Sequence, residues 1–191
     1  MVRCLTFGYR TEGLMLHQWA RENTVHVGAV IPFNRERGTG SIIGNWAQDI
    51  GVYFLVHDGE DDRLFENKVK ILKPDIILVN CYTYRLVPEI LSIPPLGCIN
   101  IHPGKLPEYR GKDPINATLD DGNRLWVTLH YMDEGYDTGD IIAEKPLEYW
   151  FPKSRWLAGV YTTCMGLDLL NKYWERICTG TAPRLKQKSI V

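Results

Sequence analysis

Residues 75–79 read DIILV, a short apolar run that begins directly after Pro74. Proline ends a preceding helix because it has no backbone N–H, and an apolar run of this length is typical of a strand buried on both faces in a parallel sheet. The chain before it alternates similar runs with amphipathic segments. Before residues 75–79, the pattern predicts strands at 2–7, 25–31 and 52–56 and helices at 12–22, 41–50 and 62–72.

This strand–helix rhythm predicts an α/β fold: an open, doubly wound, mostly parallel sheet with helices on both faces. After residue 97 the rhythm changes, and the sequence predicts strands at 97–102, 124–132 and 139–147 with helices at 115–122 and 156–177. In such sheets, ligands bind at the carboxyl ends of the strands. We therefore expect the chemistry in the segments that directly follow strands.

Composition excludes several classes of protein. The chain has 191 residues with 22 Lys+Arg against 23 Asp+Glu, so clustered positive charge for a nucleic-acid partner is not expected. No apolar stretch reaches the roughly 18–20 residues of a membrane span, so no membrane partner is expected. The five cysteines are scattered and never form a CxxC pair, which favours reduced thiols in a cytoplasmic protein.

Polar residues stand at the end of one predicted strand and in the turn between two others. Asn100 and His102 lie two apart at a strand end, so alternation points them to the same face. Asp137 and Asp140 flank a tight turn downstream. A strand-end Asn-x-His by itself is more often local hydrogen bonding than catalysis, but Asn, His and Asp together could supply a general base, a proton carrier and an oxyanion donor.

The same region carries a family resemblance. Residues 100–111 read NIHPGKLPEYRG, Pro114 follows, then TLH at 128–130 and GYDTGDI at 135–141. Together these motifs resemble the formyltransferases that use 10-formyltetrahydrofolate, most closely the sugar N-formyltransferases. The resemblance implies a Rossmann-like fold and a single catalytic domain over residues 1–191, with a short C-terminal helical extension at about 154–179. One departure is Gly104, where many members carry Ser.

By this resemblance, Asn100, His102 and Asp137 match the family's catalytic residues. The Asn100 amide and a protonated His102 would stabilise charge on the formyl oxygen. Asp137 would accept a proton and favour the charged form of His102. The co-substrate would be 10-formyltetrahydrofolate, and no metal is expected.

The resemblance also implies binding segments. For the folate it gives two runs, one after the strand at 75–79 and one before Asp137: Tyr82, Tyr84, Arg85, Leu86, Val87, Met132, Asp133, Glu134, Gly135 and Tyr136. For the acceptor, the candidates are Tyr9, Arg10, Thr11, Arg110 and His130, with an aromatic side chain from the Trp150–Trp156 region. Arg110 has a structural alternative, which is to pin the 103–111 loop, and Tyr84, Leu86 and His130 have packing alternatives.

The expected acceptor is the amine of a nucleotide-linked amino sugar. A tRNA acceptor is disfavoured because nothing of domain size follows the catalytic part and the charge is nearly neutral. Glycinamide ribonucleotide is disfavoured because FGYRTEG at 7–13 lacks a Gly-Ser-Asn phosphate turn and Glu12 would repel a phosphate. Glycinamide ribonucleotide or another small amine stays an alternative, as do a formyltetrahydrofolate hydrolase and a non-catalytic folate-binding protein. The apolar C-terminal helix suggests a homodimer.

Overall fold

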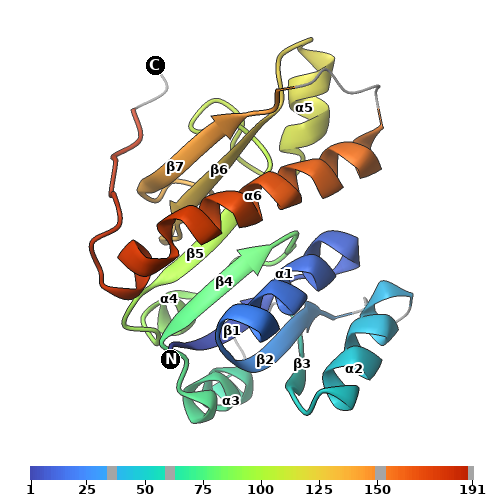
Figure 1. Cartoon of the computed structure of the whole chain (residues 1–191), viewed down its shortest axis with the longest axis vertical. Helices are drawn as coiled ribbons and strands as arrows, with labels where there is room; N and C mark the ends of the chain where they lie inside the picture. Colours follow the sequence, from blue (N-terminus) through green and yellow to red (C-terminus); the bar gives the residue numbers. More distant parts are fainter. Residues whose placement is uncertain (34–37, 59–62, 149–153, 189–191) are drawn as a thin grey trace. The chain divides into compact units, whose positions relative to one another are not determined.

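The computed structural model describes residues 1–33, 38–58, 63–148 and 154–188 (Figure 1). The chain divides into two compact units, Met1–Ile99 and Asn100–Val191. Within the described residues, no helix is long and apolar enough to cross a membrane.

The first unit has the strand–helix alternation that the sequence predicts. Its sheet has the order β3-β2-β1-β4, and all its pairs are parallel. The short helix α4 was not predicted; Pro88 stands at its first turn, a position that tolerates a missing N–H. The elements are β1 (Arg3–Phe7), α1 (Arg10–Asn23), β2 (Val25–Pro32), α2 (Thr39–Asp49), β3 (Tyr53–His57), α3 (Arg63–Leu72), β4 (Ile76–Asn80) and α4 (Pro88–Leu91).

Helices cover both faces of this first sheet. On β1, Thr6 points to one face, where its hydroxyl lies 2.6 Å from Nδ1 of His17 on α1. Its neighbour Phe7 points to the other face and packs edge-on against Phe65 of α3, with ring centroids 6.1 Å apart. Successive residues of a strand face opposite sides, so α1 and α3 lie on opposite faces, as expected for a doubly wound sheet.

Two glycines set the junction between β1 and α1. A Cβ on Gly8 would lie 2.5 Å from the carbonyl oxygen of Asn80 and 2.8 Å from Cα of Gly13. Only glycine allows this approach. The start of α1 is thereby held against the carboxyl ends of β1 and β4, the edge where ligands are expected in such sheets.

The second unit contains the end of β5 and the elements that follow it. Its strands have the order β5-β6-β7, with β6 and β7 antiparallel. Helix α6 begins after Ser154, whose hydroxyl accepts the Leu157 N–H, and it approaches β5 so closely that a Cβ on Gly166 would meet Ile101. The elements are β5 (Cys98–His102), α5 (Pro114–Asp120), β6 (Trp126–Tyr131), β7 (Ile141–Pro146) and α6 (Arg155–Cys178).

The segment after α6 returns to β7 (Figure 1). Leu185 forms an antiparallel bridge with Ile141, with two N–H···O bonds of 2.9 Å. This bridge fixes the residues around Leu185 next to the turn between β6 and β7.

Candidate active site

Asn100 and His102 lie near the end of β5 and share one face of the strand, as the sequence predicts. Ile101 points the other way, is 3% exposed and packs against Gly166 of α6. His102 is also only 3% exposed. Strand alternation therefore presents an amide and a buried imidazole side by side.

Asp137 reaches the same place from the turn between β6 and β7. Its Oδ2 accepts the Gly111 N–H at 2.9 Å and lies 3.6 Å from Nδ1 of His102. Its Oδ1 accepts the Asn100 Nδ2–H at 3.4 Å. The three residues that the family resemblance singles out thus converge around one point within the second unit.

His130 is a fourth member of this cluster. The β6–β7 register shifts between Leu129 and His130, and such a bulge re-aims a side chain. The buried His130 ring accepts the second Asn100 Nδ2–H at its Nε2 (3.2 Å), while Oδ1 of Asp137 lies 3.5 Å from the same nitrogen. His130 therefore lies against the Asn100 amide and Asp137.

Hydrogen-bond partners fix the tautomers of both imidazoles. Nε2 of His102 lies 2.6 Å from the carbonyl oxygen of Tyr109, and Nδ1 of His130 lies 2.8 Å from the carbonyl oxygen of Tyr131. A carbonyl only accepts, so these nitrogens carry hydrogen. The opposite nitrogens, Nδ1 of His102 and Nε2 of His130, face Asp137.

Burial decides the charge of His102. Burial lowers the pKa of this imidazole, and the opposing effect of Asp137 does not restore it. His102 is therefore neutral near pH 7, with a lone pair on Nδ1. The sequence-based expectation of a protonated His102 is corrected here: the carboxylate is close, but desolvation outweighs it.

Asp137 is ionised. Burial alone would raise the pKa of its carboxyl, but the neighbouring His130 and His102 rings and the hydrogen bond from the Gly111 N–H together lower this pKa to about 2. The centre thus combines a carboxylate, a neutral imidazole and an amide donor.

The cluster also has the spacing of a metal-ligand set. One ligand atom each from His102, His130 and Asp137 lie within 4.8 Å of one another. Nε2 of His130 already accepts from Asn100, and Oδ2 of Asp137 already accepts from Gly111. Two of the three candidate ligand atoms therefore already accept hydrogen bonds from protein donors.

Arg110 and Gln187 join two loops beside Asp137. The Arg110 guanidinium donates from Nε (3.0 Å) and Nη2 (2.6 Å) to Oε1 of Gln187. Nε2 of Gln187 donates to the carbonyl oxygens of Asp137 (2.8 Å) and Gly139 (2.7 Å). This arrangement matches the loop-pinning alternative for Arg110. Sequence reasoning missed Gln187, because it follows the last helix without any motif or periodic pattern.

The first expected folate segment lies in the first unit, between β4 and α4. Leu86 is buried at 1% exposure, and the hydroxyl of Tyr82 lies 2.6 Å from Nδ1 of His57. Tyr84 packs edge-on against the His57 ring, and Arg85 is exposed, as Val87 is in part. The side chains of Tyr82 and Leu86 are therefore part of the packing.

The second expected folate segment, 132–136, is a solvent-facing loop beside Asp137. Its residues Asp133, Glu134, Gly135 and Tyr136 are exposed, and Met132 is half-buried. The Asp133 carboxylate accepts the Gly135 N–H (3.1 Å) and the Thr138 hydroxyl (2.6 Å). These bonds give the loop a defined shape.

The three acceptor candidates of the first unit lie at the start of α1. Tyr9 is 6% exposed and packs in a core cluster with Ala29, Ile31 and Ile43. Arg10 is exposed and Thr11 is half-buried. For the Trp150–Trp156 region of the second unit, Trp156 is 62% exposed, whereas Trp150 lies outside the described residues.

Comparison with known proteins identifies the family. The model of the formyl transferase family matches residues 11–150, well over half of the chain. A methionyl-tRNA formyltransferase of Halothermothrix orenii is 34% identical over 160 residues, which cover 81% of this chain and 51% of that protein. The chain spans about half the length, or less, of the curated relatives it matches.

Solved structures share the fold at low identity. A 4-N formyltransferase from Francisella tularensis superposes with a TM-score of 0.78 at 19% identity, covering 98% of this chain and 74% of that one. The formyltransferase PseJ from Anoxybacillus kamchatkensis, solved with a UDP-linked formamido sugar and tetrahydrofolate, gives 0.64 at 20% identity, covering 98% and 82%. These matches confirm the Rossmann-like α/β fold, and the family model, which covers residues 11–150, shows that the chain belongs to the formyl transferase family.

Proposed function

We propose that this chain catalyses N-formyl transfer from 10-formyltetrahydrofolate to the amine of an acceptor. The observation that carries the proposal is the convergence of Asn100, His102 and Asp137 around one point, from β5 and from a turn far along the chain. Binding alone does not require a carboxylate beside a neutral imidazole. The family of the chain supports the same reaction.

In the proposed mechanism, Nδ1 of His102 is the proton carrier. The co-substrate supplies an electrophilic formyl carbon. The neutral Nδ1 takes the proton that the acceptor amine loses and returns it to the departing nitrogen. Asp137, with Oδ2 at 3.6 Å, stabilises the imidazolium that exists between these two steps.

The Asn100 amide is the proposed oxyanion donor. One of its N–H groups is held by Nε2 of His130 at 3.2 Å, and the other makes the longer 3.4 Å bond to Asp137. The longer bond is the weaker one, so this N–H is the one that turns to a developing oxyanion. Removing one such donor typically slows a reaction about 10²–10³-fold.

Folate binding is proposed for the two segments that the family motif indicates, 82–87 and 132–136. The complex of PseJ with tetrahydrofolate supports a folate co-substrate for the family. Because Tyr82 and Leu86 are packed, we propose that main-chain N–H and C=O groups recognise most of the folate ring. Substitutions of their side chains should then act through packing.

For the acceptor, we propose an amino sugar, most simply one linked to a nucleotide, with Tyr9, Arg10 and Thr11 as candidate contacts. The sugar-acting proteins among the structural neighbours support it, at 15–20% identity. Oε2 of Glu12 is buried without a hydrogen-bond partner among the described residues, and this carboxylate at the start of α1 disfavours a phosphate there. The second candidate is methionyl-tRNA, which the names of the curated relatives favour.

One experiment separates these acceptors. The protein is incubated with 10-formyltetrahydrofolate and, in parallel, with nucleotide-linked amino sugars, glycinamide ribonucleotide and methionyl-tRNA, and the gain of one formyl group is followed by mass spectrometry. We expect formylation of an amino sugar, and His102→Asn should reduce the rate about 10²–10⁴-fold. Formylation of methionyl-tRNA alone would replace the sugar proposal. Unchanged turnover in His102→Asn would refute the mechanism.

A further inference from the structure

We propose that Gln187 is a positioning residue for the Asp137 carboxylate, and that the segment after α6 is therefore part of the catalytic apparatus. This inference rests on the proposed function. The relevant contacts all lie within the second unit.

The side-chain amide of Gln187 uses its full hydrogen-bonding capacity. Its two N–H groups donate to the carbonyl oxygens of Asp137 and Gly139, and its oxygen accepts twice from Arg110. A side-chain amide offers two donors and two acceptor sites. A side chain that satisfies all four is held in one orientation, and so are the loops that it joins.

The loop that carries Asp137 needs such support. Asp137 has φ +53°, in the left-handed region, which a non-glycine residue occupies only when its surroundings hold it there. Its main-chain carbonyl is held by Gln187, and its carboxylate is held by the N–H of Gly111, next to Arg110. Gln187 thus connects the two loops whose contact aims Asp137 at His102.

Other contacts anchor the segment independently of the Gln187 side chain. Leu185 bridges Ile141 in both directions, and the Arg184 guanidinium lies 3.7 Å from the centroid of the Tyr131 ring. Lys186 pairs with Asp140 at 2.9 Å. Removing the Gln187 amide should therefore leave the segment in place and release only the Asp137 turn.

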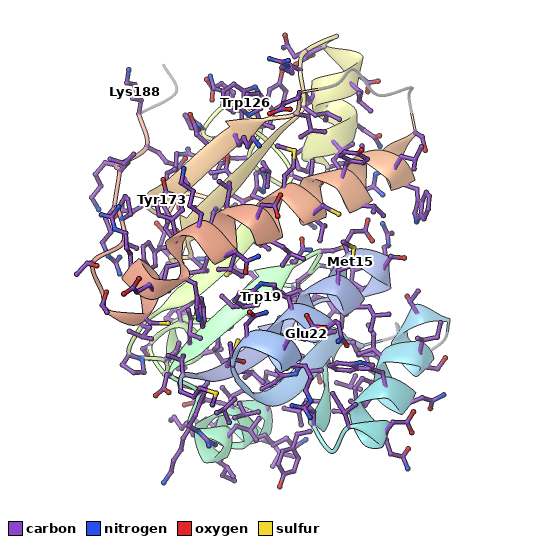
Figure 2. The ribbon with its side chains drawn as sticks, in the orientation of Figure 1. Met15, Trp19, Glu22, Trp126, Tyr173 and Lys188 are labelled. Carbon is purple, nitrogen blue, oxygen red and sulfur yellow. The ribbon has the colours of Figure 1, made fainter. Side chains whose placement is uncertain are left out.

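The test compares Gln187→Leu and Gln187→Glu with the unchanged protein. Glutamate keeps an acceptor for Arg110 but loses both donors to the Asp137 turn, so both variants should lower kcat about 10–10²-fold, with KM values within about twofold. Lys188→Met is the matched control. Lys188 is exposed and points away from the ribbon at the end of the described segment (Figure 2). The kcat of Lys188→Met should therefore equal that of the unchanged protein.

A second measurement does not depend on turnover. The carboxyl pKa of Asp137, followed by ¹³C NMR and assigned by the loss of its signal in Asp137→Asn, should rise in Gln187→Leu and Gln187→Glu, because the Gly111 bond loosens. If the unchanged protein formylates no acceptor, the proposed function fails, and the NMR result alone decides this inference. Wild-type kcat in both Gln187 variants, or an unmoved Asp137 pKa, would overturn it.

Discussion

Lowering the pH from 7 to 5 should destabilise this protein through a buried and a partly buried histidine of the first unit. His17 on α1 and His26 on β2 flank the hydroxyl of Thr6, at 2.6 and 2.7 Å. Nε2 of His17 lies 3.1 Å from the carbonyl oxygen of Gly8, so it carries the hydrogen and Nδ1 accepts from Thr6. Protonating Nδ1 would break this arrangement.

The size of the effect follows from the shifted pKa values. Burial, and secondarily the charge of His26, lowers the pKa of His17 from 6.5 to about 3, and burial lowers that of His26 to about 4. Because the unfolded chain binds more protons below pH 6.5, stability is lost as the pH falls through that value. At pH 5 each histidine alone lowers the free energy of unfolding by about 2 kcal/mol. The two repel each other when charged, so their joint loss should be about 2–4 kcal/mol.

The assay is urea denaturation at pH 7 and pH 5, with His26→Gln as the matched variant. Glutamine keeps an N–H donor for Thr6 and cannot titrate, so its loss of unfolding free energy between the two pH values should be about 1–2 kcal/mol smaller than in the unchanged protein. His102 also has a lowered pKa and acts in the same direction in both proteins, so it cancels in the comparison. Equal losses in the two proteins would refute the reasoning.

Three further predictions concern packing and the reaction. Gly104→Ser should lower the free energy of unfolding by about 1–3 kcal/mol and slow formyl transfer, because a Cβ would lie 2.9 Å from Cβ of Pro114 and 3.0 Å from Nε2 of His102. Thermal unfolding measures the first effect and kcat measures the second. Gly44→Ala should raise the free energy of unfolding by about 0.5–1 kcal/mol, since the nearest atoms to its Cβ would be those of the Phe54 ring, at an ordinary 3.4 Å. A lower free energy of unfolding in urea denaturation would contradict this prediction. The acid limb of kcat/KM should lie below pH 6.5, because the proposed base is His102 with its lowered pKa; a limb above pH 7 in the pH–rate profile would contradict this.

Local patterns in the sequence were sufficient to predict most of the secondary-structure elements and the placement of two of the three candidate catalytic residues. Apolar runs and helical periodicity predicted the strands and the longer helices, and strand alternation predicted that Asn100 and His102 share a face. The four-residue α4 was missed because a single helical turn has no periodicity to detect.

Contacts between distant parts of the chain were not predictable from local pattern. Asp137 lies 37 residues beyond Asn100, and its turn chemistry would look the same on any surface. Only the family resemblance brought it to the site. The direction of the His130 side chain depends on a register shift against β7, and the proposed role of Gln187 depends on where the chain returns after α6. Neither leaves a signal in its own neighbourhood of the sequence.

The charge of His102 shows why a list of candidate residues still left the mechanism open. From the sequence, a nearby carboxylate favours an imidazolium, which would make His102 a hydrogen-bond donor from the start. In the folded chain the imidazole is 3% exposed, and desolvation lowers its pKa despite Asp137. A buried neutral imidazole can first take a proton and then give one back, whereas a permanent imidazolium can only give. The depth of the strand end below the surface therefore supports the proposal that His102 begins the reaction as a base.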